Sequence, residues 1–278
     1  MQKILVPTDG SGESEKALTI ARQIASAQDA ELLLVRVVEP MTTSLTAGGG
    51  EVSADAFEQF SQAVDDEAEA AMSQLAAKIG SGVRVRTALL KGPVESALLD
   101  YEAEEKPDLV VMATHGRTGL ARFALGSVTD RLIREGKVPV FVTRRSSEAD
   151  AKIERALVML DGSGAAEEAL DVLRKLIGKP VRSILLYRVV RNSQDRGPAM
   201  TYLEGVAARL AAEGVETQCS VDIGEPRHDV ERAAKDADFV VLCTHGRTGF
   251  DRLRHGSVAE YVMRHLEKPA LMVRSSDT

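Results

Sequence analysis

The hexapeptide Thr-His-Gly-Arg-Thr-Gly at residues 114–119 recurs letter for letter at residues 244–249. Each copy follows a short apolar run that is typical of a buried β-strand, at residues 108–113 and 238–243. A Gly-Ser pair follows each copy and opens an amphipathic helical pattern. A glycine-rich turn between a strand and a helix presents backbone N–H groups and the positive end of the helix dipole, which suit a phosphate. The chain is therefore predicted to contain two copies of one anion-binding α/β unit.

The repeat can be followed through both halves of the chain. Asp9 and Asp161 each follow the first strand and lie 152 residues apart (161 minus 9), whereas the histidines of the hexapeptides lie 130 apart (245 minus 115). The first half therefore holds extra residues, most of them between residues 39 and 83. With 278 residues, two domains are expected. We assign residues 1–145 to the first domain, residues 153–276 to the second, and the polar stretch from Arg144 to Lys152 to the linker.

Strand and helix patterns alternate along each half. Apolar residues recur every three or four positions from about Ser14, over residues 57–79 and after Pro93, whereas the strands are short apolar runs. Pro93 and Pro226 are placed in the first turn of a helix. This alternation predicts an α/β fold with parallel sheets that are covered by helices on both faces.

Composition excludes several kinds of partner. The formal net charge of -7 gives no basic field for nucleic acid or an anionic membrane. No apolar run approaches the length of a membrane span, and no secretory leader pattern opens the sequence, so the expected compartment is the cytoplasm. Cys219 and Cys243 match no metal-ligand spacing and are interpreted as small buried apolar residues.

Three segments are expected to line one crevice, because ligands of open parallel sheets bind beyond the carboxyl ends of the strands. Asp9 follows the first strand, Val37 lies at the end of the second, and the hexapeptide follows the fourth. The loop from Gly116 to Ser127 is expected to hold phosphates, with Ser127 both capping its helix and offering a hydroxyl. Asp9 is expected to reach ribose hydroxyls or a Mg²⁺ ion. Its alternative role is to bind the N–H groups of its own turn.

The charged and titratable residues of the two loops have further possible roles. Catalysis by His115 or His245 is disfavoured, because the sequence supplies no matching nucleophile and orienting acid. Arg117 and Arg247 are loop cations that either approach phosphate or stay solvated. The sequence has no Walker loop, and no Gly-x-Gly-x-x-Gly follows the first strand of either half, which excludes ordinary P-loop and dinucleotide-dehydrogenase sites.

The segment from Met41 to about Ala54 is small and polar and has no counterpart of equal length in the second half. It is predicted to be a mobile loop beside the crevice, serving as a lid or a partner-binding loop. A phosphate cradle at Gly48 to Gly50 is the less favoured alternative.

Taken together, these motifs resemble the universal stress protein family. The resemblance rests on residues 6–11, on residues 36–38, and on the run from Ala113 through the Gly126-Ser127-Val128 segment, and it extends to both halves. It implies two tandem doubly wound domains, each with a five-stranded parallel sheet of order 3-2-1-4-5. It also implies that ATP binds in some members through Gly, two residues, Gly, nine residues, and Gly-Ser or Gly-Thr.

The resemblance carries specific residues over to this chain. The candidate nucleotide-binding residues are Pro7, Thr8, Asp9, Val37, Ala113, His115, Gly116, Arg117, Gly126, Ser127 and Val128 in the first half, and Asp161, Val189, Gly246, Arg247, Gly256 and Ser257 in the second. Both halves depart from the pattern, because Ala113 and Cys243 replace its first glycine. Met159 and Leu160 also replace the Pro-Thr turn in the second half. Stronger binding is therefore expected in the first domain.

Several functions stay open at this point. The favoured one is an ATP-binding stress-response or regulatory protein with slow or no hydrolysis. The alternatives are an ATP pyrophosphatase or nucleotidyl transferase on the same scaffold, and a dimerisation module with an empty pocket. The resemblance also predicts that residues 140–142 and 270–273 form an antiparallel ladder inside the chain and thereby cover two sheet edges. Pairing of whole chains into a homodimer is left open.

Overall fold

The computed structural model describes residues 1–39, 54–114, 125–144, 151–244 and 257–275. Along the chain the elements are β1 (Lys3–Pro7), α1 (Gly12–Gln28), β2 (Glu31–Val38), α2 (Ala54–Ile79), β3 (Arg84–Lys91), α3 (Val94–Glu105), β4 (Leu109–Ala113), α4 (Ser127–Glu135), β5 (Val140–Thr143), β6 (Arg155–Met159), α5 (Gly164–Arg174), β7 (Ser183–Val190), η2 (Ser193–Asp195), α6 (Arg196–Ala211), β8 (Glu216–Ile223), α7 (Pro226–Ala233), η3 (Ala234–Asp236), β9 (Phe239–Thr244), α8 (Ser257–His265) and β10 (Ala270–Arg274).

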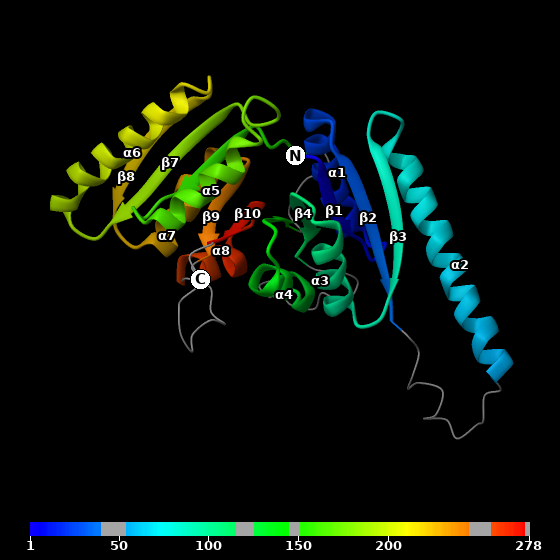
Figure 1. Ribbon diagram of the computed structural model, residues 1–278. Helices are drawn as coiled ribbons and strands as arrows, with labels where there is room; N and C mark the ends of the chain where they lie inside the picture. Colours follow the sequence, from blue (N-terminus) through cyan, green and yellow to red (C-terminus); the bar gives the residue numbers. More distant parts are fainter. Residues whose placement is uncertain (40–53, 115–124, 145–150, 245–256, 276–278) are drawn as a thin grey trace.

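The strands form one ten-stranded sheet of order β3-β2-β1-β4-β5-β10-β9-β6-β7-β8, which runs the length of the arched molecule in Figure 1. Each half has the same order when its strands are numbered from one to five, and all pairs inside a half are parallel. The predicted α/β class and the order 3-2-1-4-5 are confirmed.

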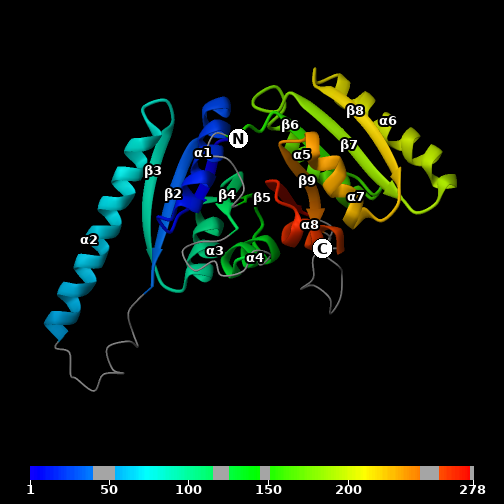
Figure 2. The same ribbon diagram turned by 180° about the vertical axis from the view of Figure 1, so that it is seen from behind.

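Two helical layers cover the sheet, because each strand directs alternate side chains to opposite faces. Helices α1, α2, α5 and α6 pack on one face, where Ile4, Phe141 and Phe239 lie in the core. Helices α3, α4, α7 and α8 pack on the other, over Leu5 and residues that alternate with the first set. Figures 1 and 2 show the two layers from opposite sides.

The helix starts follow local capping chemistry. Ser11 and Ser163 accept the N–H groups of Ser14 and Ala166 and so cap α1 and α5. Pro226 opens α7 as predicted, whereas Pro93 is the residue before α3 rather than a member of its first turn. Its fixed backbone angle suits either position.

The two halves meet at an antiparallel pair of strands. Ala270 of β10 lies opposite Val142 of β5, and Met272 lies opposite Val140. Behind this ladder the rings of Phe141 and Phe239 have their centroids 5.3 Å apart. The predicted pairing inside the chain is therefore confirmed, and the last strand of each half is an interior strand of the sheet.

A pair of arginines reinforces this junction, and one of them is Arg144, which was predicted to begin the polar linker. Arg144 is only 8 % exposed, and its guanidinium donates to the carbonyl oxygens of Met263 at 2.7 Å and Val262 at 2.9 Å, in the last turn of α8. Arg274, which follows it by the repeat spacing of 130 residues, donates to Gly136 O at 3.2 Å, at the end of α4. Each half thus places a cation at the negative end of a helix in the other half.

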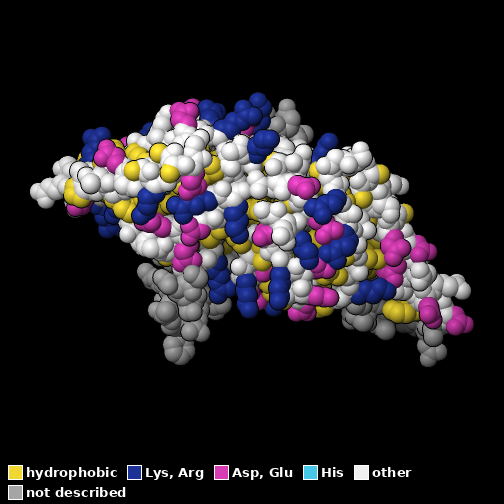
Figure 3. All heavy atoms as spheres, turned by 45° about the horizontal axis from the view of Figure 1, so that its top comes forward, with side chains coloured by type: hydrophobic (Ala, Val, Ile, Leu, Met, Phe, Trp, Pro, Cys, Tyr) yellow, Lys and Arg dark blue, Asp and Glu magenta, His cyan; other side chains and the backbone are white. Residues whose placement is uncertain are grey.

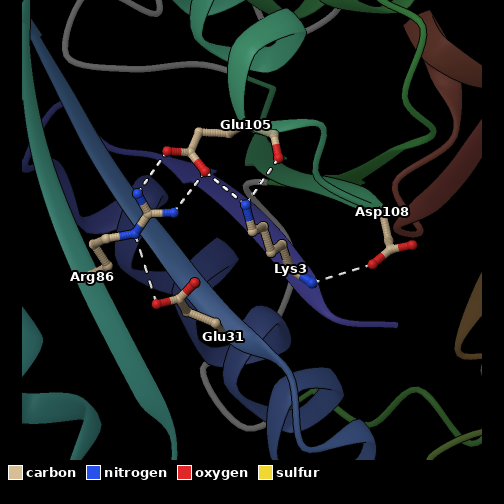
Figure 4. Close-up of polar contacts among 5 residues, drawn as sticks. All are labelled: Lys3, Glu31, Arg86, Glu105 and Asp108. Carbon is tan, nitrogen blue, oxygen red and sulfur yellow. Dashed lines mark hydrogen bonds and ion pairs between the residues drawn. The ribbon is translucent and has the colours of Figure 1, made fainter.

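At the amino end of the sheet, charged side chains from β1, β2, β3, the end of α3 and the start of β4 contact one another (Figure 4). The Arg86 guanidinium donates to both carboxylate oxygens of Glu105 at 2.6 Å, and Lys3 Nζ donates to Glu105 Oε2 at 2.8 Å. Arg86 Nε also lies 3.7 Å from Glu31 Oε1. Asp108 accepts the backbone N–H of Lys3 at 3.2 Å, which aligns the start of β1 with that of β4.

The predicted loop from Met41 to about Ala54 falls almost entirely outside the described residues, which resume at the start of α2. Within the described part of the chain, no helix is both long enough and apolar enough to cross a membrane.

We predict that Arg144→Ala lowers the free energy of unfolding by about 2 to 4 kcal/mol, because buried charge-assisted hydrogen bonds are lost and helix carbonyls lose their donors. The matched control is Arg274→Ala, which removes a partly exposed arginine with a longer bond and should cost less than about 1 kcal/mol. Chemical denaturation measures both variants. Equal losses would contradict the unequal burial of the two arginines.

A pH prediction follows from the amino-end network. Hydrogen bonds from Arg86 and Lys3 lower the pKa of Glu105 from 4.5 to about 2. A carboxyl whose pKa is lower in the folded state stabilises the fold above its unfolded pKa, and this stabilisation is lost as the pH falls from 4.5 towards 2. Glu105→Gln should therefore flatten the loss of stability over this interval. The control is Glu104→Gln at an exposed neighbouring residue. In this variant the free energy of unfolding should depend on pH as it does in the wild type.

Candidate functional site

The candidate site lies where the connections of the sheet diverge. In the first half β1 and β4 are neighbours in the sheet. The chain continues from β1 to β2 on one side of this pair, and from β4 to β5 on the other side. The carboxyl ends of β1 and β4 therefore lie side by side with α1 and α4 leaving in different directions. This is the place where open α/β sheets bind ligands.

The turn after β1 is held by its own side chains. Thr8 is buried, its Oγ1 lies 2.9 Å from Ser14 Oγ, and it accepts the N–H of Gly10 at 3.1 Å. Asp9 Oδ1 accepts the backbone N–H of Ser11 at 3.0 Å and its hydroxyl at 2.6 Å. The local role foreseen for Asp9 is therefore present, and it fixes this carboxylate at the edge of the crevice.

Gly126 lies against the end of β4. Its N–H donates to Thr114 O at 2.9 Å, and a Cβ at this position would lie only 2.6 Å from the same oxygen. Its φ of -61° is open to any residue, so the requirement is for space and not for backbone angle. Thr129 Oγ1 donates to Ala113 O at 3.0 Å and adds a second tie between α4 and β4. The glycine thus brings the N-terminus of α4 onto the carboxyl end of the strand.

The predicted capping role of Ser127 is wrong. Gly126 occupies the capping position without a side-chain bond, and Ser127 is the first helical residue. The exposed Ser127 hydroxyl donates to Glu95 Oε1, in the first turn of α3, at 3.0 Å. A carboxylate from the neighbouring helix therefore lies at the positive end of α4 in this structure. The positive end of a helix is the end at which a negative charge is favoured.

The remaining predicted residues of the first half divide between the two faces of the sheet. Val37 and Val128 are half-buried against the core beneath α3 and α4, whereas Ala113 is half-buried against the core beneath α1. Pro7 ends β1 and is also half-buried. The structure brings these residues to the carboxyl end of the sheet, where β1, β2 and β4 finish and α4 begins.

Several predicted residues lie outside the described part of the chain, and these are His115, Gly116, Arg117, His245, Gly246, Arg247 and Gly256. Ser257 begins α8 in the second half, as Ser127 begins α4 in the first.

The second half repeats the turn but changes its surroundings. Asp161 Oδ1 accepts the N–H of Ser163 at 2.9 Å and its hydroxyl at 2.6 Å, as Asp9 does in the first half. Leu160 is buried where the first half has Thr8, so the threonine–serine bond has no equivalent. Arg188 lies over the turn at Gly162. A Cβ added to this glycine would lie only 2.7 Å from Arg188 Nη1.

Sequence reasoning missed both Arg188 and Glu95. The Arg188 guanidinium also lies 5.5 Å from the centre of the Tyr202 ring, which holds it beside the turn. Val189, the next residue in β7, is half-buried on the α7 face. Alternation along β7 predicts that Arg188 lies on the opposite face of the sheet from Val189. It does not predict that the long Arg188 side chain reaches the turn at Gly162.

Cys243 occupies the position of Ala113 at the end of β9. Its side chain is buried, and burial together with the nearby Glu168 and Asp161 carboxylates raises the pKa of the thiol to about 12. The thiol is therefore protonated at neutral pH and behaves as an apolar group. Cys219 is half-buried, with its pKa raised by burial.

The described residues contain no group of three or more His, Cys, Asp or Glu side chains placed to hold a metal ion. The Mg²⁺ site suggested for Asp9 therefore has no preformed set of protein ligands among them.

We predict that Gly126→Ala destabilises the ligand-free protein by about 1 to 3 kcal/mol, because the added methyl overlaps Thr114 O and the strand must shift. Gly12→Ala is the matched control. A Cβ on Gly12, at the start of α1, meets no atom within 4 Å and should be neutral or slightly stabilising. Unfolding in denaturant separates the two outcomes, and equal stability of both variants would remove the packing role of Gly126.

Comparison with known proteins agrees with this architecture. A profile of the universal stress protein family matches residues 1–144 and again residues 152–274. A universal stress protein of Mycolicibacterium smegmatis is 29% identical over 98% of this chain and 96% of its own length. One from Methanocaldococcus jannaschii is 34% identical over 52% of this chain and 82% of its own.

The fold has a close counterpart among solved structures. A universal stress protein from Archaeoglobus fulgidus superimposes with a TM-score of 0.71 at 19% identity, over 99% of this chain and 97% of that one. At this identity the likeness speaks for the fold alone. The match of the family profile to both halves identifies the chain as a member of the universal stress protein family with two tandem domains.

Proposed function

We propose that the first domain binds ATP together with Mg²⁺ and that the protein is a nucleotide-dependent stress-response regulator without strong catalytic activity. The observation that carries the proposal is the N-terminus of α4, which meets the carboxyl end of β4 next to the turn after β1 and holds the Glu95 carboxylate on Ser127. An ATP phosphate would take the place of this carboxylate.

The other residues would divide the remaining parts of the nucleotide between them. Asp9, with its carboxylate fixed by Ser11, would accept hydrogen bonds from ribose hydroxyls or contribute to the Mg²⁺ shell. Phosphate oxygens would provide most of the metal ligands, as Mg²⁺ usually binds through one or two carboxylates and the substrate phosphates. The loop from Gly116 to Arg117, together with Val37 and Val128, would complete the pocket.

Weak binding or none is proposed for the second domain. Leu160 and Met159 replace the Thr8 and Pro7 turn, Cys243 adds a sulfur at the end of β9, and Arg188 covers the turn at Gly162. Arg227 is the second residue of α7, as Glu95 is the second residue of α3. Its positive charge would favour phosphate binding in the second domain, in contrast to the changes above. The ranking of the two sites therefore depends on shape more than on charge.

Strong catalysis is not favoured by the turn chemistry. The hydroxyl of Thr8 lies beside that of Ser14, and the Asp9 carboxylate binds Ser11, so these groups are engaged in holding the turn. Hydrolysis would then be slow or absent. A dimerisation module with an empty pocket is the second candidate, and it is favoured by the β5–β10 ladder, which joins the two halves by backbone pairing.

Titration calorimetry with ATP and Mg²⁺ tests the proposal. Asp9→Ala should weaken binding by about 1 to 3 kcal/mol through the loss of charge-assisted hydrogen bonds. Glu95→Gln should tighten binding by about tenfold, because it removes a competing anion near the phosphates. Unfolding curves of both variants establish that each is folded before titration.

The matched control is Arg227→Gln, the corresponding change in the second half, which should leave the affinity unaltered if the first domain carries the site. A change with Arg227→Gln alone would reverse the ranking of the domains. The absence of binding heat in the wild type would favour the empty dimerisation module.

A further inference from the structure

Large apolar side chains are exposed at both ends of the arch. Among the described residues these are Phe57 at 40 %, Phe60 at 50 % and Ile223 at 48 % exposure. The two phenylalanines lie near the start of α2 at one end, and Ile223 ends β8 at the opposite end (Figure 1). Exposed aromatic residues that are close together typically mark an interaction surface.

The α2 end carries a groove of about 120 Å³ between the first half of that helix and the ends of β2 and β3. Phe57, Phe60 and Val64 provide its apolar wall, and Asp65 and Lys91 also line it. Asp65 is only 8 % exposed, and its Oδ2 accepts from Lys91 Nζ at 2.5 Å. The groove thus combines an apolar wall with a buried ion pair.

Acidic residues surround this groove. Glu39, Asp55, Glu58 and Asp66 are all exposed at the same end of the molecule, and Lys91 is the basic residue of the groove lining. Figure 3 shows Asp and Glu side chains gathered around hydrophobic atoms at the α2 end. We name this surface, consisting of the groove and its acidic surroundings, the acidic end.

The opposite end is built from the same elements with the opposite charge. In β2 and β3, Val38 is in register with Lys91; in β7 and β8, Val190 is in register with Ile223. The residue after Val38 is Glu39, whereas the residue after Val190 is Arg191.

Arg196 begins α6 at this second end, and Arg191 and Arg196 are both exposed. We name the surface around Ile223, Arg191 and Arg196 the basic end. It also carries the exposed acids Asp195 and Glu225, and the exposed Arg227 offsets one of them.

These two ends are complementary, but they cannot meet within one molecule. Both Figure 1 and Figure 2 place the start of α2 and the start of α6 at opposite extremities of the sheet. Two acidic ends would repel each other, so a symmetric contact of this surface with itself is disfavoured. We propose that the occupant of the acidic end is the basic end of a second copy of this chain, with Ile223 against the phenylalanines and the arginines facing the exposed carboxylates of Asp55 and Glu58.

Such a contact joins different surfaces of the two partners and is therefore heterologous. It leaves the β5–β10 ladder untouched, because that ladder lies in the middle of the sheet, away from the starts of α2 and α6 (Figure 1). Repetition of the contact closes a ring or extends a chain of molecules according to its angle.

Sedimentation velocity of the full chain over a range of protein concentrations tests this inference. The wild type should show concentration-dependent association that weakens as salt is added. Asp55→Arg with Glu58→Arg cancels the negative charge of the acidic end, and Arg191→Glu with Arg196→Glu makes both ends acidic. Each double variant alone should dissociate at about tenfold higher concentration or more than the wild type.

The mixture of these two variants provides the decisive measurement. The native basic end of the first variant still fits the native acidic end of the second, so association should return on mixing. A further variant, Phe57→Ser with Phe60→Ser, should weaken association without changing charge, and unfolding curves establish that each variant is folded.

Three results would overturn the inference. The first is a wild type that stays monomeric at every concentration. The second is association that survives in either charge-reversed variant alone, and the third is a mixture that remains dissociated.

Discussion

The antiparallel pairing of β5 with β10 is the constraint on which the rest of the structure depends. Each half has an edge at its last strand, and an unpaired edge exposes backbone groups that recruit other chains. Joining the two edges turns two five-stranded sheets into one sheet of ten strands and leaves β3 and β8 as the only edges within the described residues. Arg144 and Arg274 extend this junction from the sheet to the helices, because each binds carbonyl oxygens at the end of a helix in the other half.

The packing that builds the first half also brings a helix N-terminus to the carboxyl end of its sheet. Gly126 must lack a side chain because the start of α4 touches Thr114 O, irrespective of any ligand. Once the helix starts there, its positive end points to the carboxyl edge of the sheet, and Glu95 occupies that position. A glycine motif of this kind is therefore evidence for a strand–turn–helix geometry first and for phosphate binding second.

The sequence was informative wherever the signal was local or periodic. The apolar runs at residues 140–142 and 270–273 predicted the last strands, and the alternation of elements predicted the parallel α/β halves. Arg144 was predicted to begin the linker because the stretch from Arg144 to Lys152 is polar and lacks periodicity. Its buried role could not be predicted, because its partners lie 118 and 119 residues away and no local pattern indicates them. Glu95 was missed for the same reason, since it reaches Ser127 across 32 residues. The capping error at Ser127 was a shift of one residue, at a helix end where Gly126 itself fills the capping position.

Duplication of the unit lets the two halves differ in chemistry while the backbone stays the same. The turns at Asp9 and Asp161 have nearly identical hydrogen bonds, yet Thr8 is replaced by Leu160 beside them. A homodimer of single units would have to carry any such change at both sites, because its two subunits are identical. In one chain the pairing of β5 with β10 fixes the geometry of the junction, so each crevice and each end of the arch is free to specialise. The asymmetry between the halves is thus a direct consequence of building the two-fold arrangement from a single chain.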